Sequence, residues 1–195
     1  MSKFHSWFQK LALPVVEAAF HLYFGLKVEG RENLPAGGCV VCPNHCQYSD
    51  PPIAAVAVSN RHTMRCMAKK ELFSIRGLAP LITWLGAFPV DRERADLAAI
   101  KTALQSVKDG SKLIIFPQGT RGASEDEAKD GAAMLAMRTH APIVPMYISE
   151  NKHFRSHVVV RIGKPFLPEG GRKDYAALTH EILRRIYALR DGVDG

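Results

Sequence analysis

The chain has 195 residues, 47% of them apolar and 23% charged. These proportions are ordinary for a folded globular protein, and the length suits one domain with a real core. Disordered, collagen-like and low-complexity classes are therefore excluded. Basic residues outnumber acidic ones by 26 to 19, and the net charge of +7 favours an acidic partner: nucleic acid, an anionic membrane or a phosphorylated substrate. With four cysteines and no secretory leader, we expect a reducing cytoplasmic setting.

The N-terminal region, residues 1–25, is expected to form an amphipathic helix. Its most apolar stretch, Leu11–Leu26, is interrupted by Pro14, Glu17 and His21. As a helix it would be about 24 Å long, shorter than the roughly 30 Å hydrocarbon core of a bilayer. The apolar residues at helical spacing are Phe4, Trp7, Phe8, Leu11, Val15, Ala18, Leu22 and Leu26. This pattern fits a helix lying in a membrane interface, and equally one packed on the domain core.

Residues 26–195 are expected to form a single α/β domain. Helical spacing predicts helices over 51–59, 97–107 and 175–189, with Asp50 as the cap of the first and Gly110 as the end of the second. Short apolar runs predict strands over 26–29, 39–42, 63–67, 87–90, 113–116, 143–148 and 158–162. Strands alternating with helices predict a mixed, largely parallel central sheet flanked by helices, and no linker or repeat divides the chain.

The loop over residues 44–50 carries a histidine and an aspartate that packing alone does not require. A loop of this length can fold back so that the Asp50 carboxylate accepts a hydrogen bond from one nitrogen of His45. The other nitrogen is then a base facing outward, as in the His–Asp pairs of acyl-transfer enzymes. The simpler alternative is that Asp50 only caps the next helix and His45 lies on the surface.

Two further loops after predicted strands carry groups suited to an anion. Arg92 can donate two parallel hydrogen bonds to a phosphate, although it can equally be a solvated surface charge. Gly119, Thr120 and Arg121 form a turn that can cradle an anion, but the Gly-Lys-Ser/Thr ending of a nucleotide P-loop is missing. In an α/β domain such loops meet at one edge of the sheet, where ligands commonly bind.

Four sequence blocks, in order and spacing, resemble the glycerolipid acyltransferases, the PlsC-like family that includes 1-acylglycerol-3-phosphate acyltransferases. The blocks are Asn44-His45 followed by four residues and Asp50; Gly86 to Arg92; Phe116 to Arg121; and residues 141–145; the segment 68–72 is also similar. Phe88 stands one residue earlier than in the family pattern. Gln118 stands where the family usually has Glu, which keeps the shape, removes the charge and adds a donor.

The resemblance implies direct acyl transfer from acyl-CoA or acyl-carrier protein to a hydroxyl of 1-acylglycerol-3-phosphate, giving phosphatidic acid. His45 would take the hydroxyl proton and Asp50 would hold the imidazole ring. The residues expected to bind substrate are Asn44, Arg92, Gln118, Gly119, Thr120 and Arg121. Backbone donors near Gly119 are expected to offset the oxyanion, and no metal or other cofactor is required.

Several alternatives remain open. Cys46 beside His45 suggests a covalent acyl-enzyme as a rival chemistry. The acceptor can be another lysolipid, or the domain can bind lysophospholipid or an acyl carrier without turnover. A zinc site is not expected, because the cysteine cluster lacks a second ligand pair at similar spacing.

Positive charge is concentrated in two segments. Residues 61–94 hold seven basic against three acidic residues, and 152–190 hold nine against three, whereas 125–130 carry a net charge of −3. With no nucleic-acid recognition motif present, this distribution favours an anionic membrane surface and an acidic acyl carrier over nucleic acid. We expect a peripheral (monotopic) protein on the cytoplasmic face of the cell membrane.

Overall fold

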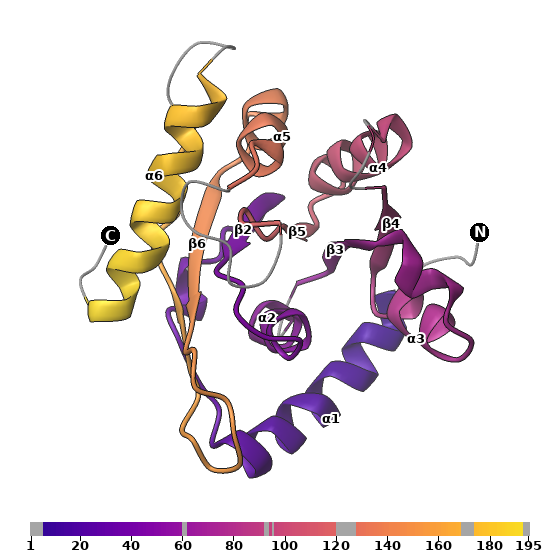
Figure 1. Cartoon of the computed structure of the whole chain (residues 1–195), viewed down its shortest axis with the longest axis vertical. Coiled ribbons are helices and arrows are strands. Elements are labelled where there is room, and N and C mark those ends of the chain that lie inside the picture. The colour runs from indigo at the N-terminus through magenta and orange to yellow at the C-terminus, as the bar shows by residue number, and fades with distance from the viewer. Residues whose placement is uncertain are drawn as a thin grey trace.

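Seven strands form one sheet in the computed structural model of the chain, which describes residues 6–59, 62–91, 94, 96–119, 128–168 and 174–192 (Figure 1). The strands are β1 (Lys27–Glu29), β2 (Cys39–Pro43), β3 (Met64–Lys69), β4 (Ala87–Val90), β5 (Lys112–Ile114), β6 (Ile143–Ile148) and β7 (Val159–Ile162). Their order is β1-β7-β6-β2-β5-β3-β4. All neighbours pair in parallel except β6 and β7, so the predicted mixed, largely parallel sheet is confirmed.

Helices cover both faces of this sheet (Figure 1). They are α1 (Ser6–Phe24), α2 (Asp50–Ser59), α3 (Leu78–Trp84), α4 (Leu97–Lys108), α5 (Gly131–Thr139) and α6 (Tyr175–Ala188), with 3₁₀ turns at Arg31–Asn33, Lys70–Ser74 and Leu189–Asp191. Helices α1 and α2 share one apolar core with the sheet, and α4, α5 and α6 share the other. This is the layered α/β architecture expected from the sequence.

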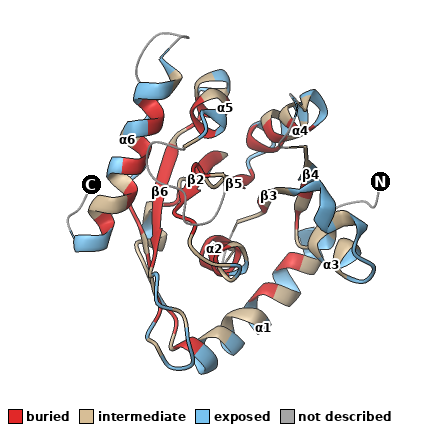
Figure 2. Ribbon diagram, in the orientation of Figure 1, coloured by how far each residue is buried: buried red, intermediate tan, exposed pale blue. Residues whose placement is uncertain are grey.

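The central strands β2 and β6 are buried along their whole length, as Figure 2 shows. Alternate side chains of a strand point to opposite faces, so Val41 packs toward α1 and α2 while Val40 and Cys42 pack toward α4, α5 and α6. A strand covered on both faces is apolar at every position. This is why uninterrupted apolar runs predicted these strands correctly.

Helices α3 and α5 were not predicted from the sequence. Helix α3 is short and carries Pro80 in its first turn, where a missing N–H is tolerated. Helix α5 is an alanine-rich stretch of nine residues without a clear alternation of apolar and polar faces. The expected strand over 113–116 is also shorter, because the chain turns at Phe116, whose carbonyl accepts the N–H of Gly119 at 3.1 Å.

Helix α1 packs on the domain with one face and leaves an apolar face exposed. Leu13 and Phe24 are buried, and the buried Gln9 amide donates to the carbonyls of Met64 and Leu85, both at 2.8 Å. On the opposite side lie five exposed small or large apolar residues, here called the apolar stripe: Trp7, Leu11, Val15, Ala18 and Leu22. Within the described residues, no helix is both long and apolar enough to cross a membrane.

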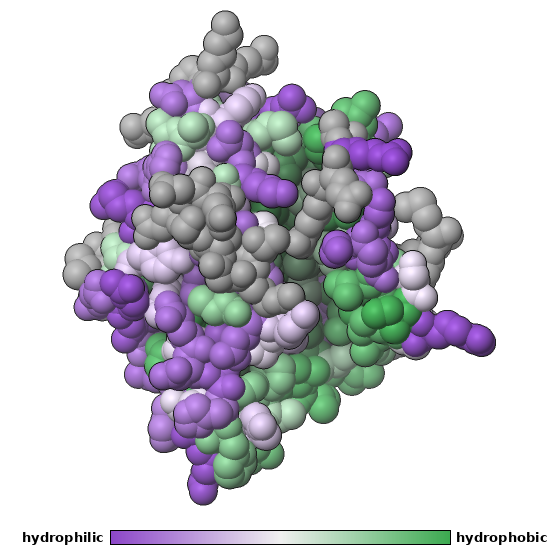
Figure 3. Space-filling model, viewed as in Figure 1, coloured by the Kyte–Doolittle hydropathy of each residue, from purple (hydrophilic) through white to green (hydrophobic). Residues whose placement is uncertain are grey.

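The apolar stripe continues onto neighbouring elements, and the space-filling view shows hydrophobic surface over α1 and α3 (Figure 3). At one end of α1, the Phe8 ring lies 5.5 Å from the ring of Trp84 in α3. At the other end, the Tyr23 ring lies 5.5 Å from that of the exposed Phe154. The expected packing of this helix on the domain core is confirmed for one face, whereas a membrane contact through the other face and the division of the chain at residue 25 stay predictions.

Candidate active site

The loop between β2 and α2 folds back on the carboxylate of Asp50. His45 Nδ1 lies 3.0 Å from Asp50 Oδ2, and the backbone N–H groups of Cys46 and Gln47 donate to the same oxygen at 2.6 and 2.7 Å. Asp50 is also the first residue of α2. One carboxylate therefore closes the loop at the start of the helix and contacts the imidazole.

The second oxygen of Asp50 faces a lysine that sequence analysis did not identify. Lys152 Nζ lies 2.7 Å from Asp50 Oδ1, and both side chains are almost completely buried. Burial alone would raise the pKa of Asp50, but hydrogen bonds from His45, Lys152 and the Gln47 N–H, with the lysine charge, hold it below its ordinary value.

This environment defines the proton arrangement on His45. The ionised Asp50 carboxylate is an acceptor only, so Nδ1 of His45 carries the hydrogen that lies between them. The neutral imidazole then has its lone pair on Nε2, which has no hydrogen-bond partner among the described residues. The ring is otherwise held against Phe116, with ring centroids 4.4 Å apart. The geometry is that of an oriented general base.

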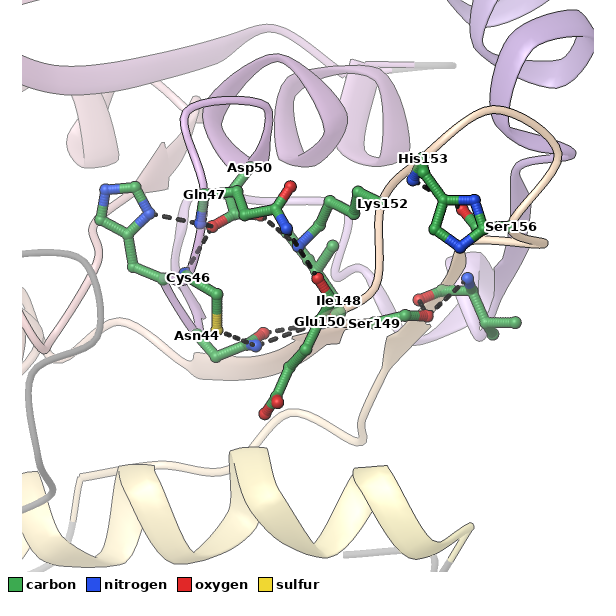
Figure 4. Close-up of polar contacts among 12 residues, drawn as sticks. Asn44, Cys46, Gln47, Asp50, Ile148, Ser149, Glu150, Lys152, His153 and Ser156 are labelled. Atoms are coloured by element: carbon green, nitrogen blue, oxygen red, sulfur yellow. Dashed lines mark hydrogen bonds and ion pairs between the residues drawn. The ribbon is translucent and has the colours of Figure 1, made fainter.

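The site lies at the carboxyl ends of three adjacent strands, β6, β2 and β5, where ligands commonly bind in α/β proteins. Asn44 joins two of them: its side chain donates to the Ile148 carbonyl at 3.0 Å and accepts the Ile148 N–H at 2.7 Å (Figure 4). The predicted substrate-binding residue Asn44 is thus buried, with its amide holding the β2–α2 loop against the end of β6.

Gln118 contacts the site from the loop after β5. Its Oε1 accepts the backbone N–H of His45 at 2.8 Å, and its Nε2 donates to the Tyr187 hydroxyl of α6 at 3.1 Å. A glutamate carboxylate offers the same acceptor to His45, so the exchange of Glu for Gln preserves that contact. The amide adds a donor for Tyr187, a residue that no sequence motif indicated.

The remaining predicted site residues belong to turns. Gly119 has φ +69°, and a Cβ there would lie 3.2 Å from the side chain of Lys129, so the turn favours glycine. The Gly119 N–H is engaged with the carbonyl of Phe116. Arg92, Thr120 and Arg121 lie outside the described residues.

The rival nucleophile Cys46 is in an unfavourable setting. Burial raises the pKa of its thiol, and the negative charges of Asp50 and Glu150 raise it further. Reactive cysteines instead have lowered pKa values and positive surroundings. The four cysteines are free, and the described residues contain no cluster of three side chains able to hold a metal ion.

A pocket of about 470 Å³ separates the end of α1 from the β2–α2 loop. Its lining residues are Tyr23, Phe24, Cys46, Gln47, Tyr48, Ser49 and Lys152. His45 is not among them. The pocket therefore adjoins the His45–Asp50 pair, here called the dyad, through Lys152 and through the β2–α2 loop, here called the dyad loop.

Comparisons with known proteins agree with this architecture. The family model described as Acyltransferase matches residues 25–149. A 1-acyl-sn-glycerol-3-phosphate acyltransferase of Bacillus subtilis is 31% identical, covering 95% of this chain and 98% of the relative. A Streptococcus pneumoniae enzyme of the same name is 37% identical over 52% of this chain and 38% of its own length.

A solved structure extends the match to the fold. The 1-acyl-sn-glycerophosphate acyltransferase PlsC from Thermotoga maritima superposes with a TM-score of 0.70 at 26% identity, covering 93% of this chain and 81% of that one. Family model, sequence relatives and fold agree over most of the chain. The chain therefore belongs to the PlsC-like glycerolipid acyltransferase family, and it is an acyltransferase.

Proposed function

We propose that this acyltransferase converts 1-acylglycerol-3-phosphate to phosphatidic acid, with acyl-CoA or acyl-carrier protein as donor and His45 as the general base. The observation that carries the proposal is the 3.0 Å contact of His45 Nδ1 with Asp50 Oδ2. It lies in a chain that matches, over 95% of its length, a relative named for this reaction.

The proposed reaction needs one base and no covalent enzyme intermediate. His45 Nε2 takes the proton of the acceptor hydroxyl, and the hydroxyl oxygen attacks the carbonyl carbon of the acyl thioester. Asp50 stabilises the imidazolium formed in this step, as its ionised state permits. When the tetrahedral intermediate collapses, the carbon–sulfur bond breaks and the imidazolium returns its proton to the departing thiolate. Atoms and charges balance without a metal or other cofactor.

The proposed acceptor is anionic, and the residues assigned to its phosphate are Arg92 and Arg121, with Thr120 in the same turn. Asn44, Gln118 and Gly119 hold the loops that bound the site. The acyl carriers are also anionic, and the basic segment 152–190 supports a contact with either of them.

We also propose that the protein works at the cytoplasmic face of the cell membrane as a peripheral protein. Its acceptor is a lipid, and the apolar stripe offers a continuous surface for insertion into the bilayer interface. The stripe ends at Leu22, and the next residue, Tyr23, lines the pocket beside the β2–α2 loop, so docking by α1 brings this loop to the lipid. Free cysteines support a reducing compartment.

The test is phosphatidic acid formation by the full chain on vesicles containing 1-acylglycerol-3-phosphate, with acyl-CoA and acyl-carrier protein as separate donors. His45→Ala is expected to lower the rate by roughly 10²–10⁴, the usual contribution of a positioned base. The control His180→Ala removes an exposed histidine of α6 and is expected to leave the rate unchanged.

Three results would contradict the proposal. Full turnover by His45→Ala would remove the base from the mechanism. Binding of lysophospholipid or acyl carrier without product, in the unsubstituted protein, would indicate a binding domain. Product formed only from another lysolipid would assign a different acceptor.

A further inference from the structure

Lys152 is a buried charged residue that lies outside every sequence motif of the family. It belongs to the loop between β6 and β7, and its Nζ approaches Asp50 Oδ1 at 2.7 Å (Figure 4). The other carboxylate oxygen, Oδ2, is already engaged by His45 and by two backbone N–H groups. The two oxygens of the Asp50 carboxylate thus contact different groups: Oδ2 contacts the imidazole and the loop backbone, and Oδ1 contacts the lysine.

A buried ammonium group is a poor way to stabilise a fold. Its side chain is fully inaccessible to solvent. Removing its charge from water costs free energy, whereas burying an apolar side chain of the same size would be favourable. Apart from the ion pair, Nζ has no hydrogen-bond partner among the described residues. Its direct contact is therefore with Asp50, although its charge also lowers the pKa of the neighbouring Cys46 thiol.

The loop that carries Lys152 is fixed on both sides. On one side Gln47 Nε2 donates to the Glu150 carbonyl at 3.0 Å, which joins the loop to the dyad loop. On the other, the Arg155 N–H donates to the Tyr23 carbonyl at 2.7 Å, which joins it to the end of α1. A charge that positions another group must itself be held in place, and these bonds do so.

We propose that Lys152 is a positioning residue that acts on His45 through Asp50. It turns the carboxylate so that Oδ2 faces Nδ1, and it balances the carboxylate charge beside the imidazole. The inference rests on the proposed role of His45 as base. The charged and titratable groups that surround Asp50 are His45 and Cys46 from the β2–α2 loop, and Lys152 and Glu150 from the β6–β7 loop.

Kinetics of Lys152→Met test the role directly. We expect kcat to fall at least about tenfold, a part of the roughly 10²–10⁴ supplied by an oriented base, while KM for the acyl donor stays within about twofold. The acidic limb of the pH–rate profile moves to higher pH, because the protonated imidazole then faces a carboxylate without its counter-charge. Lys152→Gln, which keeps a donor but no charge, is expected to show the same shift.

The control is Lys27→Met. Lys27 is an exposed lysine that pairs with Glu29 at 2.6 Å, so its loss changes the net charge equally without touching Asp50. Rate and pH profile should remain those of the unsubstituted protein. A profile that shifts equally in Lys27→Met would assign the effect to net charge and overturn the proposal.

Chemical rescue separates charge from packing. Lys152 lines the pocket beside the loop, so Lys152→Ala leaves a space that a small amine can enter. n-Butylammonium is expected to restore much of the rate in detergent micelles, and n-butanol is not. Equal rescue by the alcohol would mean that Lys152 only fills space.

A measurement that needs no turnover keeps this inference distinct from the proposed function. The carboxyl carbon of Asp50, assigned in NMR spectra by its loss in Asp50→Asn, is expected to titrate at higher pH in Lys152→Met and in Lys152→Gln. An unchanged titration together with an unchanged rate would overturn the role of Lys152. Suppose instead that the titration shifts in the Lys152 variants while His45→Ala keeps full activity. The proposed role of His45 as base would then be refuted, and the effect of Lys152 on Asp50 would still stand.

Discussion

The dyad loop and the exposed face of α1 differ from the usual distribution of residues in opposite ways: one buries charged groups and the other exposes apolar ones. In the loop, ionisable groups are buried, and Asp50 meets His45, Lys152 and two backbone amides. On α1, large apolar side chains are exposed to solvent: Trp7 is 63% exposed and Leu22 is 81% exposed. Each arrangement carries a cost in stability: buried charge must be desolvated, and exposed apolar surface forgoes burial.

Both regions therefore give up some stability, one by burying charge and the other by exposing apolar surface. Proteins break the usual folding rules mainly at functional sites, and here the two departures are adjacent. The pocket between them is lined by Tyr23 and Phe24 on one side and by the loop residues Cys46 to Ser49 on the other. The loop requires exact polar partners, whereas the apolar stripe requires only area and position, so substitutions should affect them differently.

Asp50→Asn is expected to produce the largest effect on the buried side of this comparison. An amide is neutral, so it stabilises the imidazolium poorly and leaves Lys152 without a counter-charge. The initial rate of phosphatidic acid formation should fall by roughly 10²–10⁴, with little change in vesicle binding. Asp109→Asn, at the end of α4, is the matched control. A loss of less than tenfold would show that the carboxylate does not orient the base.

Substitution of the apolar stripe should affect binding and spare chemistry. Trp7 and Leu11 are about two-thirds exposed. Burying such a side chain completely contributes about 1.5–3 kcal/mol, so we expect each change to Ser to weaken vesicle binding by about tenfold. Co-sedimentation with anionic vesicles measures the effect, and turnover of a soluble short-chain acceptor should be unchanged.

The control for the stripe lies on the other layer of the molecule. Leu97 of α4 is 75% exposed, and α4 packs on the opposite face of the sheet from α1. Leu97→Ser should bind vesicles like the unsubstituted protein. Equal weakening in both variants would mean that exposed apolar residues bind lipid without regard to position.

The pH dependence of stability offers a smaller and separate readout of the buried pair. The pKa of Asp50 in the folded protein lies below its ordinary value, so this group contributes stability that is present above the unfolded pKa of about 3.9. That contribution is lost as pH falls through the lowered folded pKa. In urea unfolding between pH 7 and pH 3, the advantage of the unsubstituted protein over Asp50→Asn should therefore narrow with falling pH. A constant difference would contradict the pKa assignment.

The parts of this molecule that were predicted correctly have local signals. The buried strands β2 and β6 are continuous apolar runs, and His45 and Asp50 lie within one loop, where their spacing alone permits contact. The resemblance to the family motifs added the chemistry expected of that loop. Such features depend on neighbours in the chain, which a sequence displays directly.

The parts that sequence did not reveal depend on the order of strands in the sheet. Lys152 reads as one more charge in a basic segment, and it meets Asp50 only because β6 and β2 are neighbours. Tyr187 likewise reaches Gln118 only because α6 covers the strands that lead to the site. Non-local pairing of this kind leaves no periodicity or spacing to detect.

Cys46 belongs to both regions, and its substitution is expected to have the smallest effect. Its backbone N–H donates to Asp50, while its side chain lines the pocket that leads toward α1. A change to Ser keeps the hydrogen bond from the backbone N–H to Asp50 and a side chain of similar volume. Because burial and the nearby carboxylates raise the pKa of the thiol, its thiolate is less populated than that of an ordinary cysteine, and we expect the rate to stay within about twofold.

The measurement is the steady-state rate of Cys46→Ser, with and without a thiol-alkylating reagent. Inhibition of the unsubstituted protein by a bulky reagent, with full activity in Cys46→Ser, would mean that the modified thiol obstructs the pocket. Abolished turnover in Cys46→Ser, together with an acyl-thioester trapped on the unsubstituted protein, would instead establish the covalent route. In that case Cys46 would be the nucleophile, and His45 and Asp50 would activate its thiol rather than the acceptor hydroxyl.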